Sequence, residues 1–168
     1  MTHAVFRYLE KPPSSLLLDE IFDILATNMR QIIPTELTYE EEKARWMACV
    51  PPALTKEARQ ILLIYAEEEL AGFFQYYVTP EHSVFMMEEI QLKPAFHGSG
   101  LFGELYRFLI PRLPPDIPAV EAYAHKRNAK SLSILHHMGL ATVGEAEDPE
   151  ILHLRGDYTR LKQAYGGS

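Results

Sequence analysis

The sequence predicts an α/β domain in which a mixed, mostly antiparallel sheet of about seven strands is flanked by about four helices. Three observations lead to this prediction. Apolar residues occur at helical spacing in some segments and in short continuous runs in others. Three strand-like runs follow one another without a helix between them, which is typical of an antiparallel meander. The later strands are separated by helices, which adds a parallel crossover. A single domain over residues 1–168 is expected, because this length builds one full core.

The first half of the chain contains two helices and four strands in this prediction. Thr38 and Glu41 form a capping-box pair at the start of the second helix, and Pro51 and Pro52 are expected to end it. The expected elements are a strand at 4–11, helices at 16–29 and 38–50, and strands at 60–68, 69–79 and 83–92.

The second half begins with a helix whose apolar face contains Leu101, Leu105, Phe108 and Leu109 and which Pro111 ends. Asn128 is placed to cap a later helix that finishes at Gly139. The expected elements are helices at 99–110 and 129–138, strands at 119–125, 140–146 and 150–158, and a short tail at 159–165.

Charge and cysteine content narrow the class of protein. The formal net charge is -7 at pH 7, which disfavours binding to nucleic acid or to an acidic membrane surface. Cys49 is the one cysteine, and it is expected to be a buried small apolar residue. No apolar run has the length of a membrane span, and the first residues lack a signal core, so a cytoplasmic location is expected.

A glycine pattern in the middle of the chain indicates an anion site. Gly98, Gly100 and Gly103 form G-x-G-x-x-G ahead of a helix, and such a turn places backbone N–H groups near a pyrophosphate. One interpretation is a dinucleotide site, for which Glu121 is the acid near the ribose. The context argues against it, because three meander strands precede the helix and Glu121 stands near the start of its strand.

The other interpretation is the pyrophosphate of coenzyme A. The segment "LKPAFHGSGLFG", from Leu92 to Gly103, and the segment "NAKSLSILHHMGL", from Asn128 to Leu140, resemble the two sequence blocks of the GCN5-related N-acetyltransferase (GNAT) superfamily. The two blocks stand in the order and at about the spacing of that superfamily. The resemblance implies a strand, turn and helix that bind acetyl-CoA as the acyl donor, and no metal.

The same resemblance implies which residues contact the donor. Backbone groups of the strand before the turn are expected to bind the acyl and pantetheine part, and the turn is expected to bind the phosphates. The implied donor-binding residues are Ile90, Gln91, Leu92, His97, Gly98, Ser99, Gly100, Leu101, Phe102, Gly103, Asn128 and Ser131. His97 stands where the superfamily usually has Arg or Gln, and Leu135 stands where it often has the Tyr that acts as general acid.

Acetyl transfer to an amine requires a proton acceptor and a proton for the leaving thiolate. Glu88 and Glu89 are the candidate bases, one of which is expected to face the acceptor, because neighbouring strand residues point to opposite faces. The alternative is a solvated acidic pair. Tyr123 and His136 are candidate acids.

The function that follows is transfer of an acetyl group to a primary amine of a small molecule or peptide, directly within a ternary complex. A non-catalytic acyl-CoA-binding module is the alternative, and a dinucleotide-binding redox domain is a weaker third. A homodimer through the aromatic stretch at 72–77 is a further expectation.

Overall fold

The strands and helices follow one another in the predicted order in the computed structural model, which describes residues 3–56 and 58–165. The helices are α1 (Ser15–Ile32), α2 (Tyr39–Lys56), α3 (Leu101–Leu109), α4 (Ala129–His137) and α5 (Tyr158–Tyr165), with short 3-10 turns η1 (Pro94–Phe96) and η2 (Ile110–Arg112). The strands are β1 (Ala4–Tyr8), β2 (Gln60–Ala66), β3 (Glu69–Val78), β4 (Val84–Leu92), β5 (Ala119–His125), β6 (Ala141–Glu145) and β7 (Ile151–Asp157).

Hydrogen bonding orders the seven strands β1-β2-β3-β4-β5-β7-β6, which confirms the predicted mixed sheet. Pairing is antiparallel between β1 and β2, between β5 and β7 and between β6 and β7, and it is parallel between β4 and β5. The turn from β2 into β3 has two residues, Glu67 and Glu68, whose φ angles are 54° and 67°. Two positive φ angles are the signature of the type I′ turn, whose twist matches that of a hairpin.

The structure forms two compact units, and neither is continuous in sequence. Unit 1 contains residues 1–75 and 89–99, and unit 2 contains residues 76–88 and 100–168. The chain therefore passes from one unit to the other within β3, within β4 and again just before α3. The expectation of one domain over 1–168 stays a prediction.

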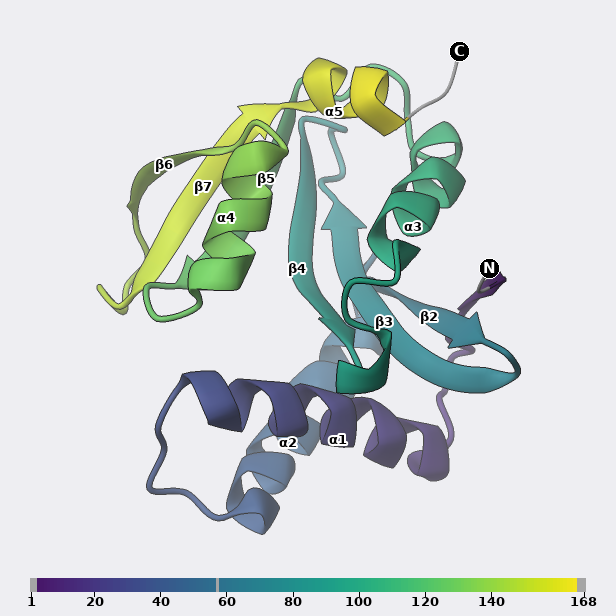
Figure 1. Cartoon of the computed structure of the whole chain (residues 1–168), viewed down its shortest axis with the longest axis vertical. Coiled ribbons are helices and arrows are strands. Elements are labelled where there is room, and N and C mark those ends of the chain that lie inside the picture. Colours follow the sequence, from purple (N-terminus) through teal and green to yellow (C-terminus); the bar gives the residue numbers. More distant parts are fainter. Residues whose placement is uncertain (1–2, 57, 166–168) are drawn as a thin grey trace. The chain divides into compact units, whose positions relative to one another are not determined.

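Unit 1 is built around an apolar core to which α1, α2 and the first strands contribute (Figure 1). Its buried members are Leu9, Ile21, Ile24, Leu54, Ile61, Leu63, Leu70 and Phe73. The aromatic rings that join α1 to α2 are Phe22 with Tyr39, at 5.3 Å between centroids, and Phe22 with Trp46, at 5.7 Å. The capping box of α2 forms as predicted, because Thr38 and Glu41 exchange hydrogen bonds between backbone N–H and side-chain oxygen.

Two predictions about α2 are wrong. The helix continues through Pro51 and Pro52 to Lys56, although each proline removes one backbone donor. Leu54, in the last turn, is fully buried in the unit 1 core, and this burial offsets the lost hydrogen bonds. Cys49, on the same helix, is exposed rather than buried.

Unit 2 has helices on one face of its sheet. The register pairs Met87 of β4 with Ala122 of β5, and Ala122 with Leu154 of β7, so these three side chains share a face. The Tyr106 hydroxyl of α3 contacts the Met87 sulfur, and burial raises the pKa of Tyr106. This contact places α3 on the Met87 face.

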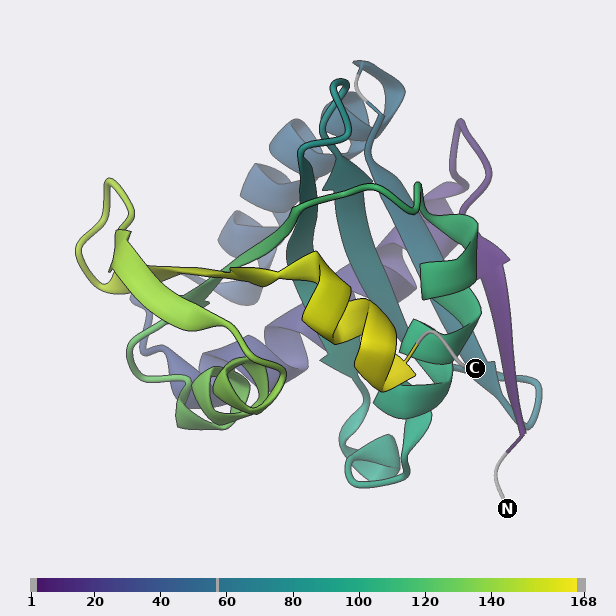
Figure 2. The ribbon, with the colours of Figure 1, turned by 90° about the horizontal axis from the view of Figure 1, so that it is seen from above.

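The two other helices of unit 2 lie on the same face. The ring of Tyr158, the first residue of α5, packs edge-on against Phe85, which shares the face of Met87. Figure 2 shows α5, in yellow, beside α3. His136 of α4 lies 3.5 Å from the hydroxyl of Thr142, which pairs with Leu154.

Two further differences from the sequence prediction concern exposure and length. The tail at 159–165 is helical and belongs to α5, because Tyr158 and Leu161 are buried there. Phe108 is only half-buried, with the Arg112 guanidinium 3.8 Å from its ring centre. In the stretch 72–77, residues Phe73, Phe74 and Tyr76 are buried in the chain, and the expected homodimer stays a prediction.

Candidate functional site

The C-terminal end of β4 is held in place by side chains of unit 1. The Asn28 amide of α1 donates to the Gln91 side chain at 2.9 Å and to the Leu92 carbonyl at 2.7 Å. The Gln91 amide in turn donates to Glu89 at 2.6 Å. Glu89, a candidate base, therefore takes part in a network that positions the strand, and Gln91 uses its side chain in the same network.

Gly72 lets β3 approach this part of β4 closely. A Cβ atom at position 72 would lie 2.1 Å from the Gln91 carbonyl oxygen and 3.0 Å from the Leu92 Cα. No side chain fits in this space. The backbone of Gln91 and Leu92, predicted to bind the acyl and pantetheine part of the donor, is thus fixed by the close approach of Gly72 and by the hydrogen bond from Asn28. Ile90, the third predicted strand residue, is half-buried.

The turn after β4 is also tied to the strand. The Nε2 atom of His97 donates to the Leu92 carbonyl at 2.9 Å, so the ring is directed at the strand end. A phosphate contact by His97 is left to Nδ1 while this hydrogen bond is closed. Ser99 donates from both its backbone N–H and its hydroxyl to the Phe96 carbonyl, and Gly98 has φ 74°.

Helix α3, in unit 2, begins at Leu101, and its N-cap residue, Gly100, has a φ of 84°, in the left-handed region. No side chain caps this end. The N–H groups of Leu101, Phe102 and Gly103 belong to the first turn, which has no intrahelical acceptors, and they carry the partial positive charge of the helix. A Cβ at Gly100 would meet nothing within 4 Å, so the space beside this turn is open. This arrangement suits an anion.

Asn128 caps α4, as predicted. Its Oδ1 atom accepts from the backbone N–H of Ser131 at 3.1 Å. Both residues are half-buried at the start of the helix, directly after β5. Leu135, which was compared with the frequent Tyr of the superfamily, is buried and contributes to packing.

The parallel pairing of β4 with β5 is short. It covers Val84–Met87 and Ala119–Ala122, although β4 continues to Leu92 and β5 to His125. Glu88 and Tyr123 are the first residues beyond this pairing, and both are candidate catalytic residues. Glu88 is half-buried and Tyr123 is exposed.

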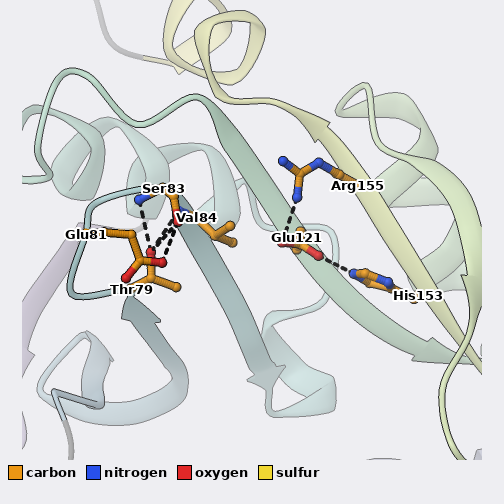
Figure 3. A network of polar contacts seen from close by, with 7 residues as sticks. All are labelled: Thr79, Glu81, Ser83, Val84, Glu121, His153 and Arg155. Atoms are coloured by element: carbon orange, nitrogen blue, oxygen red, sulfur yellow. Dashed lines mark hydrogen bonds and ion pairs between the residues drawn. The ribbon is translucent and has the colours of Figure 1, made fainter.

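The face of the unit 2 sheet opposite to α3, α4 and α5 carries a polar cluster. The register pairs Met86 with Glu121, Glu121 with Arg155 and Tyr123 with His153, so these side chains share that face. The Glu121 carboxylate accepts from His153 Nε2 at one oxygen and from Arg155 Nη1, at 3.0 Å, at the other (Figure 3). Glu121, Tyr123, His153 and Arg155 are called the Glu121 cluster below.

Burial differs strongly within the Glu121 cluster. The side chain of Glu121 is only 11% exposed, whereas those of His153 and Arg155 are 25% and 48% exposed. The Tyr123 ring stacks on the His153 ring at 4.7 Å between centroids and 15° between planes. The cluster therefore has a buried carboxyl group, and the side chains that contact it or stack beside it are partly exposed.

The second network of Figure 3 has a structural role in the connection from β3 to β4. Thr79 Oγ1 accepts from the backbone N–H groups of Ser83 and Val84, both at 3.0 Å. The Ser83 hydroxyl donates to Glu81, and this hydrogen bond is the main reason why the pKa of Glu81 is lowered.

The candidate acids are separated by the sheet. Tyr123 lies on the face of the Glu121 cluster, whereas His136 lies beside Thr142 on the face covered by helices. These two residues do not form one site. Within residues 3–56 and 58–165, no group of three or more His, Cys, Asp or Glu side chains is placed to hold a metal ion. In the same residues, no helix has the length and apolar character that crossing a membrane requires.

Sequence reasoning missed His153, Arg155 and Asn28, and it considered Glu121 only for a ribose. Glu121 and its two partners are more than thirty positions apart in sequence. The alternation of β5 could have shown that Glu121 and Tyr123 share a face. The register of β7 against β5, which brings His153 and Arg155 to them, has no signal in the sequence.

Comparison with solved structures identifies the fold. An acetyltransferase from Thermus thermophilus superposes with a TM-score of 0.70 at 17% identity, covering 94% of this chain and 99% of the other. The PaiA N-acetyltransferase from Thermoplasma acidophilum, solved in complex with coenzyme A, gives 0.67 at 15% identity, covering 93% and 99%. An acetyltransferase of the GNAT family from Desulfovibrio desulfuricans gives 0.67 at 14% identity, covering 92% and 99%. No protein-family model and no curated protein matches the sequence.

Proposed function

Because this chain has the fold of the GNAT-family acetyltransferases, we propose that it transfers an acetyl group from acetyl-CoA to a primary amine, directly within a ternary complex. The acceptor belongs to a small molecule or a peptide. The observation that carries the proposal is the start of α3, where Gly100 is left-handed, no side chain caps the first backbone N–H groups, and a Cβ at Gly100 would meet nothing within 4 Å.

The donor site on this proposal contains the residues that the sequence resemblance implied. Backbone N–H groups of Leu101, Phe102 and Gly103 hold the pyrophosphate of coenzyme A. The backbone of Ile90, Gln91 and Leu92 holds the acyl carbonyl and the pantetheine amides. Backbone amide groups do most of this binding, because His97 stands where the superfamily usually has Arg or Gln and its Nε2 atom is bound to the Leu92 carbonyl.

The acceptor reacts as a neutral amine, because the nitrogen lone pair must attack the thioester carbonyl. An alkyl ammonium group must therefore lose a proton in the site. Glu88, half-buried directly after the last residue of β4 that pairs with β5, is one of the two residues that the sequence suggested as the base for this proton.

Isothermal titration with acetyl-CoA, coenzyme A and NADH under one buffer condition tests the donor site. Binding of acetyl-CoA and coenzyme A without binding of NADH is expected. Binding of NADH alone would overturn the proposal in favour of a dinucleotide site. A screen of primary amines, with release of free thiol as the readout, then tests turnover. Donor binding without turnover of any amine would support the alternative, a non-catalytic acyl-CoA-binding module.

A further inference from the structure

The Glu121 cluster has the composition of a proton-transfer site. We propose that Nδ1 of His153 is the general base that takes the proton from the acceptor's ammonium group, and that Glu121 is the positioning residue that holds His153 in the required tautomer. The inference rests on the proposed acetyl transfer and assigns its proton acceptor to β7, a strand from which the sequence suggested none.

The tautomer follows from the hydrogen bond. A carboxylate only accepts, so the Nε2 atom that contacts Glu121 must carry the hydrogen. A neutral imidazole has one N–H and one lone pair, and the lone pair is therefore on Nδ1. Nδ1 has no hydrogen-bond partner among the residues that the structure describes. The ring is thus prepared to accept a proton at an atom that is not otherwise engaged.

The neighbours of His153 restrict its motion. Tyr123 stacks on one side of the ring and fixes its plane, and Glu121 fixes its rotation. Arg155 contacts the second oxygen of Glu121, at 3.0 Å, and keeps a positive charge beside the carboxylate whether His153 is neutral or charged. A carboxylate that orients a base in this way also stabilises the imidazolium that forms.

The position of the cluster in unit 2 supports a catalytic role. Glu121 pairs with Met86, one residue before the parallel pairing of β4 and β5 ends, and Tyr123 is the first residue of β5 beyond it. The helices of this unit cover the other face of the sheet. The cluster therefore stands where the part of β5 that does not pair with β4 begins, at residues 123–125. His153 and Tyr123 are partly exposed there to an incoming molecule.

The ammonium proton moves to His153 Nδ1, which gives an imidazolium and a neutral amine. The amine lone pair forms the C–N bond to the thioester carbonyl carbon, the C–S bond breaks, and coenzyme A leaves as a thiolate. The second proton of the former amine nitrogen goes to the thiolate, and the imidazolium releases its proton to water. Glu88 then has the role of contacting the ammonium group before the transfer.

A purely structural ion pair is the competing explanation, because Glu121 with two partners also stabilises the pairing of β5 with β7. Kinetics separate the two. His153→Gln, which keeps an amide donor for Glu121, is compared with wild type, Glu121→Gln and Glu88→Gln. His137→Gln, an exposed histidine of α4, is the matched control. Each variant is assayed at saturating acetyl-CoA with the best amine of the screen, from pH 6 to about pH 11. This range extends above the ordinary pKa of an alkylamine such as the lysine side chain, about 10.4.

We expect His153→Gln to lower kcat about 10²-fold or more near pH 7, the usual effect of losing a general base, with acetyl-CoA affinity unchanged. The loss should shrink as the pH rises past the amine's own pKa, because the acceptor then arrives neutral. Glu121→Gln should show a smaller loss with the same pH trend, and His137→Gln none. A loss that is constant with pH, or a pH-dependent loss in Glu88→Gln alone, would overturn the proposal.

A spectroscopic test needs no acceptor. Two-bond proton–nitrogen correlation of protein labelled with 15N-histidine identifies the neutral tautomer of His153, whose signals are assigned from their absence in His153→Gln. Hydrogen on Nε2 is expected, and hydrogen on Nδ1 would overturn the inference. Failure of the proposed function is recognised separately, because a wild type that neither binds acetyl-CoA nor acetylates an amine contradicts the donor site irrespective of the tautomer.

Discussion

Tyr158 combines complete burial with an unsatisfied polar group. Its side chain is 0% exposed, and its hydroxyl has no hydrogen-bond partner among the described residues. Tyr158→Phe keeps the ring against Phe85 and removes the hydroxyl, so we expect the free energy of unfolding to rise by about 1 kcal/mol. Urea unfolding measures this change.

Tyr39→Phe is the contrasting variant for Tyr158→Phe. The Tyr39 hydroxyl donates to Asp23 at 3.1 Å near the surface. Burial, as the largest cause, and this hydrogen bond raise the pKa of Tyr39. Its removal should lower the urea midpoint slightly or leave it unchanged. A fall in the midpoint of Tyr158→Phe would mean that its hydroxyl does have a partner.

The residues of the candidate site were predictable to different degrees. The glycine turn and the Asn128 cap depend on local backbone geometry, which short sequence patterns encode, and the cap formed as expected. The Glu121 cluster depends on strand register across β5 and β7, which is a tertiary property. His97 shows what a motif position does not reveal, because its Nε2 atom binds the Leu92 carbonyl and only Nδ1 is left for a ligand.

At the level of elements, Gly72 lets strand β3 approach strand β4 closely. Gly72→Ala would place a Cβ 2.1 Å from the Gln91 carbonyl oxygen, so the β4 backbone must move. Overpacking of this kind typically costs about 1–3 kcal/mol, and we expect a loss of that size in the free energy of unfolding. The displaced strand should also bind acetyl-CoA more weakly.

Gly144→Ala is the matched control for Gly72→Ala. Gly144 lies in β6, and a Cβ there meets nothing within 4 Å. Alanine also loses less chain entropy on folding than glycine, so this variant should be as stable as wild type or slightly more stable. Equal urea midpoints for Gly72→Ala and wild type would show that β4 accommodates the methyl group without strain.

The start of α3 permits a test that separates folding from binding. Gly100→Val has room for its side chain, and its cost comes from the left-handed φ of 84°, about 1–2 kcal/mol. We expect a folded variant, by circular dichroism, that no longer binds acetyl-CoA in isothermal titration, because the side chain occupies the space beside the N–H groups. Retained binding in the folded variant would rule out this turn as the phosphate site.

Most elements were predictable from sequence because their signals are local. The exceptions are α2 beyond Pro51 and the helix α5. In both, burial of one or two residues in a core, Leu54 in the first and Tyr158 with Leu161 in the second, outweighs a local signal for irregular structure. Sequence patterns do not contain this tertiary contribution.

At the scale of the whole molecule, ligand binding should raise the free energy of unfolding. A ligand that binds only the folded protein adds about 2.7 kcal/mol at a concentration of about 100 Kd. Coenzyme A is therefore expected to raise Tm in a concentration-dependent manner, and NADH at the same concentration should leave it unchanged. A shift with both, or with NADH alone, would contradict an acyl-CoA site. Gly100→Val serves as the control that should show no shift with coenzyme A.

The interleaved order of the two units has a consequence for biosynthesis. Residues 76–88 of unit 2 leave the ribosome before residues 89–99, which complete unit 1, and most of unit 2 follows later. Unit 1 lacks its last segment until residue 99 has been made, and no single cut in the chain separates the two units. Nascent chains that end between residues 76 and 88 should therefore remain sensitive to protease, and stable fragments from limited digestion should consist of two or more chain segments that stay associated.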